Sequence, residues 1–125
     1  MTATSTIVWN RACYGGGEAP RQGDGHLAAL MRFHGAAMNG GVMHAIEFCS
    51  PSQLRAAKAG CVYFGLEGVI SLIEKAEAVL KEEEDPGDFE RSLGSEYHDL
   101  ASDSQLSARF EAKHEQAPSD FAPVQ

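Results

Sequence analysis

Four side chains that often carry chemistry lie in the first half of the chain: His34, His44, Cys49 and Cys61. Imidazole and thiolate groups bind zinc, but the chain has no C-x-x-C or H-E-x-x-H pattern, so the spacing argues against a metal site. A cysteine nucleophile needs an imidazole base nearby. His44 and Cys49 are the closest such pair, and five residues place them on diverging faces of a helix. We therefore expect no metal, no cofactor and no catalytic residue.

Carboxylates are the other side chains that could take part in a reaction. Glu74 with Glu77, and the acidic run at 82–85, are candidates for an acid and base pair only if they are buried together. Their hydrophilic neighbours place them in water instead. Exposed carboxylates keep their ordinary acidity and are poor general acids at neutral pH.

The acidic residues are concentrated in the second half of the chain. Residues 1–65 contain three acidic and five basic residues, whereas residues 66–125 contain fifteen acidic and five basic ones, a net charge of −10. Such a surface either only keeps a protein soluble or meets a basic partner. Direct binding to nucleic acid is disfavoured, because phosphate contacts require clustered Lys and Arg.

The glycine-rich segments do not match a phosphate-binding loop. The run at 15–17 is not part of a G-x-x-x-x-G-K-[ST] pattern and does not follow a strand. Gly60, Gly65 and Gly68 flank or interrupt a predicted helix, which indicates close packing against a neighbouring helix.

Length and composition predict one small all-α domain. The 125 residues are 43% hydrophobic, which is enough for a single core. We expect an irregular N-terminal arm over residues 1–25 and a bundle of about five to six helices over 26–125, with Asp24 placed to cap the first helix. Three scattered cysteines, and the absence of a signal peptide or an apolar membrane span, predict a cytoplasmic protein with no membrane partner.

Hydrophobic periodicity predicts two helices over residues 26–38 and 42–49. The tripeptide at 39–41, Asn-Gly-Gly, separates them, since Asn and Gly accept left-handed backbone angles. Ser50 precedes a proline in the pattern that is typical of a helix start, so a short helix over 51–58 follows.

The most regular segment runs over residues 61–80 and predicts one long amphipathic helix. The acidic segment at 81–88, KEEEDPGD, predicts an exposed loop, and another helix or turn is expected around 89–100. Ser102 and Gln105 form a capping-box pattern that starts the last helix. The apolar face of the long helix comprises Val62, Leu66, Val69, Ile70, Ile73, Ala76 and Leu80.

Three stretches read together resemble the bacterial DNA-mimic protein family, a domain of unknown function. They are AAMNGGVMHAIE, AAKAGCVYFGLEGVISLIEKAEAVL and SEYHDLASDSQLSARFEAKHEQAPSDFAPV, within about residues 30–123. In that family the double glycine usually precedes an aromatic residue and a Gln-aromatic pair, where this chain has Val42, His44 and Ala45. The resemblance implies an all-helical, commonly dimeric and noncatalytic protein. At least one member presents carboxylates in the manner of DNA phosphates to a DNA-binding regulator.

These observations favour a noncatalytic acidic protein that binds a basic DNA-binding regulator and blocks its DNA site. One alternative is an immunity-type protein that neutralises a basic toxin through aromatic anchors such as Tyr63, Phe64 or Tyr97. Another is an enzyme or small-ligand binder with a pocket around His34, His44 and Cys49. The candidate partner-binding residues of the first hypothesis are Glu74, Glu77, Glu82, Glu84, Asp85 and Asp88.

Overall fold

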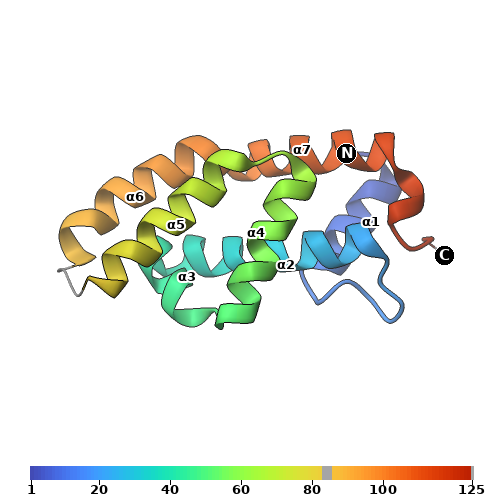
Figure 1. Cartoon of the computed structure of the whole chain (residues 1–125). Coiled ribbons are helices and arrows are strands. Elements are labelled where there is room, and N and C mark those ends of the chain that lie inside the picture. The colour runs from blue at the N-terminus through green and yellow to red at the C-terminus, as the bar shows by residue number, and fades with distance from the viewer. Residues whose placement is uncertain (83–85, 125) are drawn as a thin grey trace.

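The chain folds as an all-helical single domain, which confirms the predicted fold class (Figure 1). The computed structural model describes residues 1–82 and 86–124, without the side chains of 86–88. These residues form seven α-helices and one 3₁₀ helix, with no strand. The helices are α1 (Ala3–Ala12), α2 (Gln22–Gly40), α3 (Val42–Phe48), α4 (Pro51–Phe64), α5 (Glu67–Lys81), α6 (Pro86–Ala101), α7 (Asp103–Gln116) and η1 (Pro118–Asp120).

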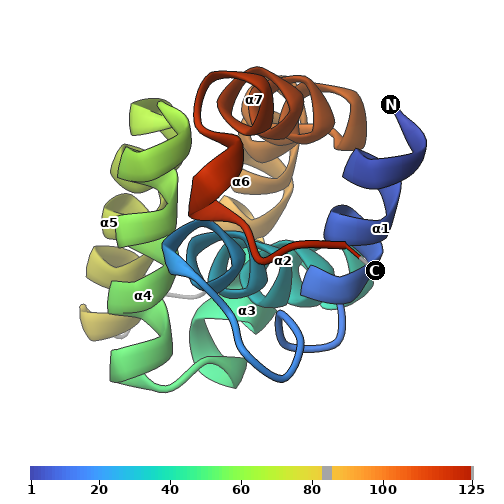
Figure 2. The same ribbon diagram turned by 90° about the vertical axis from the view of Figure 1, so that its right-hand side faces the viewer.

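Helix α2 lies at the centre of the bundle and contacts α1, α3, α4 and η1. Viewed from one end, α1, α4 and α7 surround it (Figure 2). Leu27, Leu30 and Phe33 recur at helical spacing on α2 and are fully buried, so they anchor the hydrophobic core. None of the described helices has the length and apolar content that crossing a membrane requires.

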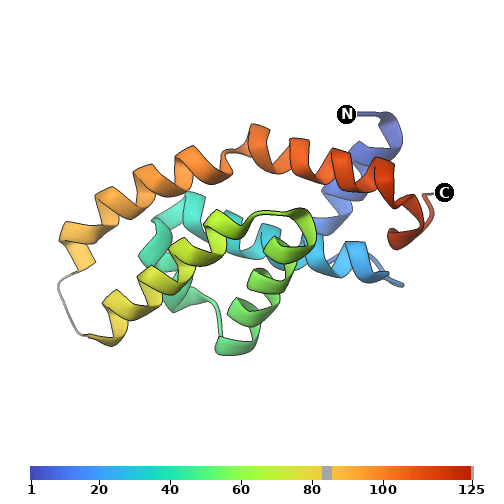
Figure 3. The ribbon, with the colours of Figure 1, turned by 45° about the horizontal axis from the view of Figure 1, so that its top comes forward.

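Helices α5 and α6 run side by side in opposite directions and form the end of the molecule farthest from the termini (Figures 1 and 3). Helix α7 continues from α6 along the same side (Figure 3). Between them, Ser102 caps α7 by accepting a hydrogen bond from the Gln105 amide, and the Gln105 side chain accepts from the Ser102 amide. The capping box predicted from the sequence is therefore confirmed.

The prediction of one helix over residues 61–80 is wrong. Helix α4 ends at Phe64, and Gly65 adopts the left-handed conformation with φ 73°. The Leu66 amide donates to the Cys61 carbonyl at 2.7 Å and the Gly65 amide to the Val62 carbonyl at 3.2 Å, which is a Schellman ending. Continuous apolar periodicity hid this break. Val62, which the prediction placed on the apolar face of the long helix, is 64% exposed.

Two of the three glycines in that region do pack closely against neighbours. A Cβ at Gly60 would lie 2.7 Å from the His26 carbonyl oxygen, and one at Gly68 would lie 3.0 Å from the Leu100 side chain. Gly65 instead serves the turn, so the packing interpretation is wrong at that position.

The N-terminal arm is not wholly irregular, because it contains α1. Thr2 caps this helix by accepting from the Ser5 amide at 3.0 Å, and Val8 and Ala12 are buried against the rest of the bundle. The expected loop is limited to the segment after α1, where the glycines at 15–17 all have positive φ.

Several helix ends differ from the predicted ones. Helix α2 starts four residues earlier than expected and continues to Gly40, while α4 extends from the Ser50 cap to Phe64. The reversal between α2 and α3 occurs at Gly41, with φ 95°. Glu90 of α6 approaches this turn, where its carboxylate accepts from the Met43 amide at 3.2 Å.

A buried carboxylate joins the C-terminal segment to the start of α2. Asp24 is 0% exposed and accepts from the Arg11 guanidinium at 2.8 Å, the Arg21 amide at 3.0 Å and the Ala122 amide at 2.7 Å. Phe121, which is 3% exposed, fills the space that Gly23 leaves by having no side chain. The C-terminal segment is therefore part of the core.

Candidate functional site

The predicted partner-binding surface falls on α5, the following link and the start of α6. Glu74 is exposed on α5, and Glu82 is exposed at the C-cap of the same helix. Glu77 lies one turn after Glu74, and its carboxylate pairs with the Lys58 ammonium of α4. The structure therefore brings Glu74 and Glu77 onto adjacent turns, while Glu82 lies at the helix end.

The other three candidates are only partly placed. Glu84 and Asp85 lie outside the described residues. Asp88 lies in the first turn of α6, and its side chain is not described.

Two lysines compensate part of the negative charge on this face. Besides the Lys58–Glu77 pair, the Lys75 ammonium of α5 lies 3.2 Å from the Glu96 carboxylate of α6. Both side chains of that pair are about half exposed, so it contributes little to stability. Within the described residues, Glu74 and Glu82 have no ion-pair partner, so they carry the uncompensated charge of the candidate surface.

Sequence reasoning missed a hydrogen-bonded chain that joins α2, α6 and α7. The buried His34 ring lies between the Tyr97 hydroxyl, 2.7 Å from Nδ1, and the Asp103 carboxylate, 2.6 Å from Nε2. A proton on Nε2 lets the ring donate to Asp103 and accept from Tyr97, which satisfies all three groups. The capping box marks residue 103 as the first of α7, but no local pattern links it to His34.

The environment of Tyr97 keeps its hydroxyl protonated. Burial, with smaller effects of Cys61 and Asp103, raises the pKa of Tyr97 well above its ordinary value. The phenol therefore remains a hydrogen-bond donor at an alkaline pH at which an ordinary tyrosine would ionise.

The histidines and cysteines of the first half do not converge on one site. His44 is exposed and stacks on Phe48 with ring centroids 5.7 Å apart, whereas His34 faces α6 and α7. Burial raises the pKa of the Cys61 thiol to about 12 and also raises the pKa of Cys49. A buried, protonated thiol is a poor nucleophile and a poor metal ligand. Among the described residues, no three His, Cys, Asp or Glu side chains are placed to hold a metal ion.

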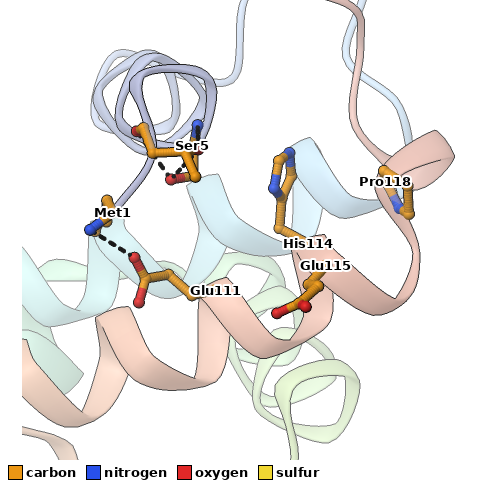
Figure 4. A pocket seen from close by; sticks show the side chains of 7 residues that line it. Met1, Ser5, Glu111, His114, Glu115 and Pro118 are labelled. Carbon is orange, nitrogen blue, oxygen red and sulfur yellow. Dashed lines mark hydrogen bonds and ion pairs between the residues drawn. The ribbon is translucent and has the colours of Figure 1, made fainter.

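A cavity of about 600 Å³ opens between α1 and α7 (Figure 4). Glu111 and Glu115 of α7 line it, and Glu111 lies 3.0 Å from the Met1 amino group. His114 also lines the cavity, but its ring packs against Phe110 and Phe121. The histidine is therefore occupied in packing, and of the two carboxylates in the wall the one on Glu111 is paired with the Met1 amino group.

No protein-family model matches this chain, and no match to it was found among curated proteins or solved structures. The resemblance to the DNA-mimic family thus stays a prediction from the sequence.

Proposed function

We propose that this protein is a noncatalytic acidic interaction protein that imitates DNA, binds a basic DNA-binding regulator and blocks its DNA site. The observation that carries the proposal is the charge asymmetry: residues 66–125 have a net charge of −10, and Glu74 and Glu82 stand exposed without an ion pair in the described part of the chain.

The spacing of carboxylates on a helix supports this proposal physically. Side chains three or four residues apart on a helix lie about 5–6 Å from one another at Cβ, as Glu74 and Glu77 do by position, with the Glu77 carboxylate also paired with Lys58. One strand of DNA has a charge about every 3.4 Å along the axis. An acidic helix therefore presents a field of similar sign and scale, which attracts the Lys and Arg residues of a DNA-binding surface.

The environments of the proposed aromatic anchors give less support to the immunity-type alternative. Phe64 and Tyr97 are 4% and 3% exposed, so neither side chain presents a surface for a toxin to contact. The Tyr63 hydroxyl donates to the Asp120 carboxylate at 2.6 Å, which ties that ring to the C-terminal segment. A partner would have only part of the Tyr63 ring to contact.

The enzyme or ligand-binding alternative needs His34, His44 and Cys49 around one pocket. These side chains point to different surroundings, since His44 is exposed while His34 and Cys49 are buried. The acidic face is the better basis for a functional proposal.

The proposal can be tested by affinity capture from a bacterial lysate with two matched baits. The first carries Glu74→Gln and Glu82→Gln on the candidate face. The control carries Glu18→Gln and Glu47→Gln, which remove the same charge from exposed positions in the first half. Captured proteins are then challenged with duplex DNA and with rising salt.

We expect the wild-type and control baits to retain a DNA-binding protein that duplex DNA releases, and the candidate-face bait to lose most of it. Binding should also weaken steeply with salt, because exposed charges are screened within about 8–10 Å at physiological ionic strength. If DNA does not compete, or if the two altered baits behave alike, mimicry is not the function of this face.

A further inference from the structure

A second cavity, of about 370 Å³, lies between α1, α2 and α7. Its wall combines Trp9 and Met31, which are both half-buried, with the Asp103 carboxylate. Ser104 and Ser107 of α7 complete the polar side of the wall. An aromatic ring, a thioether and one carboxylate in the same cavity form an environment suited to an organic cation.

The Asp103 carboxylate is exposed, but a hydrogen bond from the His34 ring fixes its position. Its side chain is 80% exposed, while its Oδ1 atom accepts from the buried His34 ring at 2.6 Å. His34 is itself fixed by the Tyr97 hydroxyl at 2.7 Å. Within the described residues, His34 is the one side chain that hydrogen-bonds the Asp103 carboxylate, so its second oxygen has no side-chain partner there. A carboxylate that is already fixed loses little conformational entropy when it binds a cation.

The charged groups that line the cavity favour a cationic ligand. Asp103 is the one charged side chain that lines the cavity in the described part of the chain. Met1 also lines the cavity, and its amino group is paired with Glu111. Trp is the aromatic side chain that binds cations best, and Arg stacks on it while donating to a carboxylate.

We infer that this cavity binds a guanidinium side chain, with Asp103 as its ion-pair partner and Trp9 as its stacking surface. The inference rests on the proposed function, because it supplies one specific contact for a basic partner. It places that contact on α1 and α7, away from the charged surface of α5 and α6.

The test uses Nα-acetyl-arginine amide as the probe and Nα-acetyl-citrulline amide as its uncharged analogue. Trp9 is the chain's one tryptophan, so its fluorescence reports directly on the cavity. We expect a saturable change with arginine, at a dissociation constant on the order of 1 mM for a ligand of this size, and no saturable change with citrulline.

Two matched variants assign the contact. Asp103→Asn should weaken arginine binding at least about tenfold, because it removes the charge but keeps the size of the side chain. Asp99→Asn removes the same charge from an exposed position outside the cavity and should bind as the wild type does. If Asp103→Asn fails to fold, Met31→Lys provides a second test, since a tethered ammonium in the cavity should abolish arginine binding.

The inference is overturned if arginine gives no saturable change, if citrulline binds equally well, or if Asp103→Asn and Asp99→Asn bind arginine alike. These outcomes are separate from the fate of the proposed function. If arginine binds but no captured protein is released by DNA, only the proposed function is contradicted. If DNA releases a captured protein but arginine does not change the Trp9 fluorescence, only the assignment of this cavity as a guanidinium site is contradicted.

Discussion

The two ends of the bundle use carboxylates in opposite ways. At the end that holds the C-terminal segment, Asp24 is fully buried and accepts three hydrogen bonds. At the other end, which α5 and α6 form (Figure 1), Glu74 and Glu82 are exposed and have no ion pair in the described part of the chain. The surroundings of a carboxylate, and not the number of charges near it in the sequence, therefore decide whether it stabilises the fold or remains available to a partner.

The largest expected effect comes from removing the buried carboxylate. Asp24→Ala leaves two backbone amides without their acceptor and removes the carboxylate that pairs with the Arg11 guanidinium, so we expect a loss of about 3–5 kcal/mol in the free energy of unfolding, measured with urea. The control Glu18→Ala changes an exposed carboxylate and should stay within about 0.5 kcal/mol of the wild type. Equal urea midpoints for the two variants would contradict a structural role of Asp24.

An alkaline titration extends the comparison to the buried chain around His34. Because the pKa of Tyr97 is raised in the folded state, folding favours its protonated form. The stability that Tyr97 adds in this way is fully present below the ordinary tyrosine pKa of about 10. Above that pH it is lost, at up to about 1.4 kcal/mol per pH unit.

Tyr97→Phe should therefore lose stability more slowly than the wild type between about pH 10 and pH 12, as urea unfolding across this range would show. Tyr14, which is 92% exposed, provides the control, and Tyr14→Phe should follow the wild-type slope. A Tyr97→Phe slope equal to that of the control would mean that the buried phenol does not couple folding to pH.

The break between α4 and α5 has a smaller effect. Gly65→Ala forces a side chain into a left-handed conformation, at a cost of roughly 1–2 kcal/mol. Gly35 lies inside α2 with nothing within 4 Å of an added Cβ, so Gly35→Ala should stabilise the protein by up to about 1 kcal/mol. The thermal unfolding temperature should fall for Gly65→Ala and rise for Gly35→Ala. A shift of the same sign in both variants would contradict the left-handed conformation of Gly65 in the turn.

The smallest effect on stability is expected at the acidic end. The pair Glu74→Gln and Glu82→Gln removes exposed charges and should change the free energy of unfolding by no more than about 0.5 kcal/mol per site. Urea unfolding should thus remain nearly unchanged, while binding in the capture experiment falls. A large loss of stability would show that these carboxylates belong to the fold.

Local sequence patterns predicted helix starts better than helix continuity. The Ser50 cap and the Ser102 capping box were identified correctly because a cap is made by residues only three apart. The continuous apolar period over 61–80 concealed the Gly65 turn, since a glycine is tolerated inside a helix unless its backbone angles are known.

The candidate site was only partly predictable for a similar reason. The sequence identified the acidic half and the exposed positions of Glu74 and Glu82, because charge and helix phase are local properties. It did not reveal that Lys58 pairs with Glu77, or that His34 reaches Asp103, because these contacts join residues far apart in the chain.

The sequence by itself determined the all-helical class, the Ser50 and Ser102 caps and the acidic second half. These depend on periodicity, on contacts within one helical turn and on composition. The tertiary structure alone decided that Asp24 is buried beneath the C-terminal segment and that Asp103 is fixed at the edge of a cavity. Both depend on which helices meet, and that is set by the packing of the whole core.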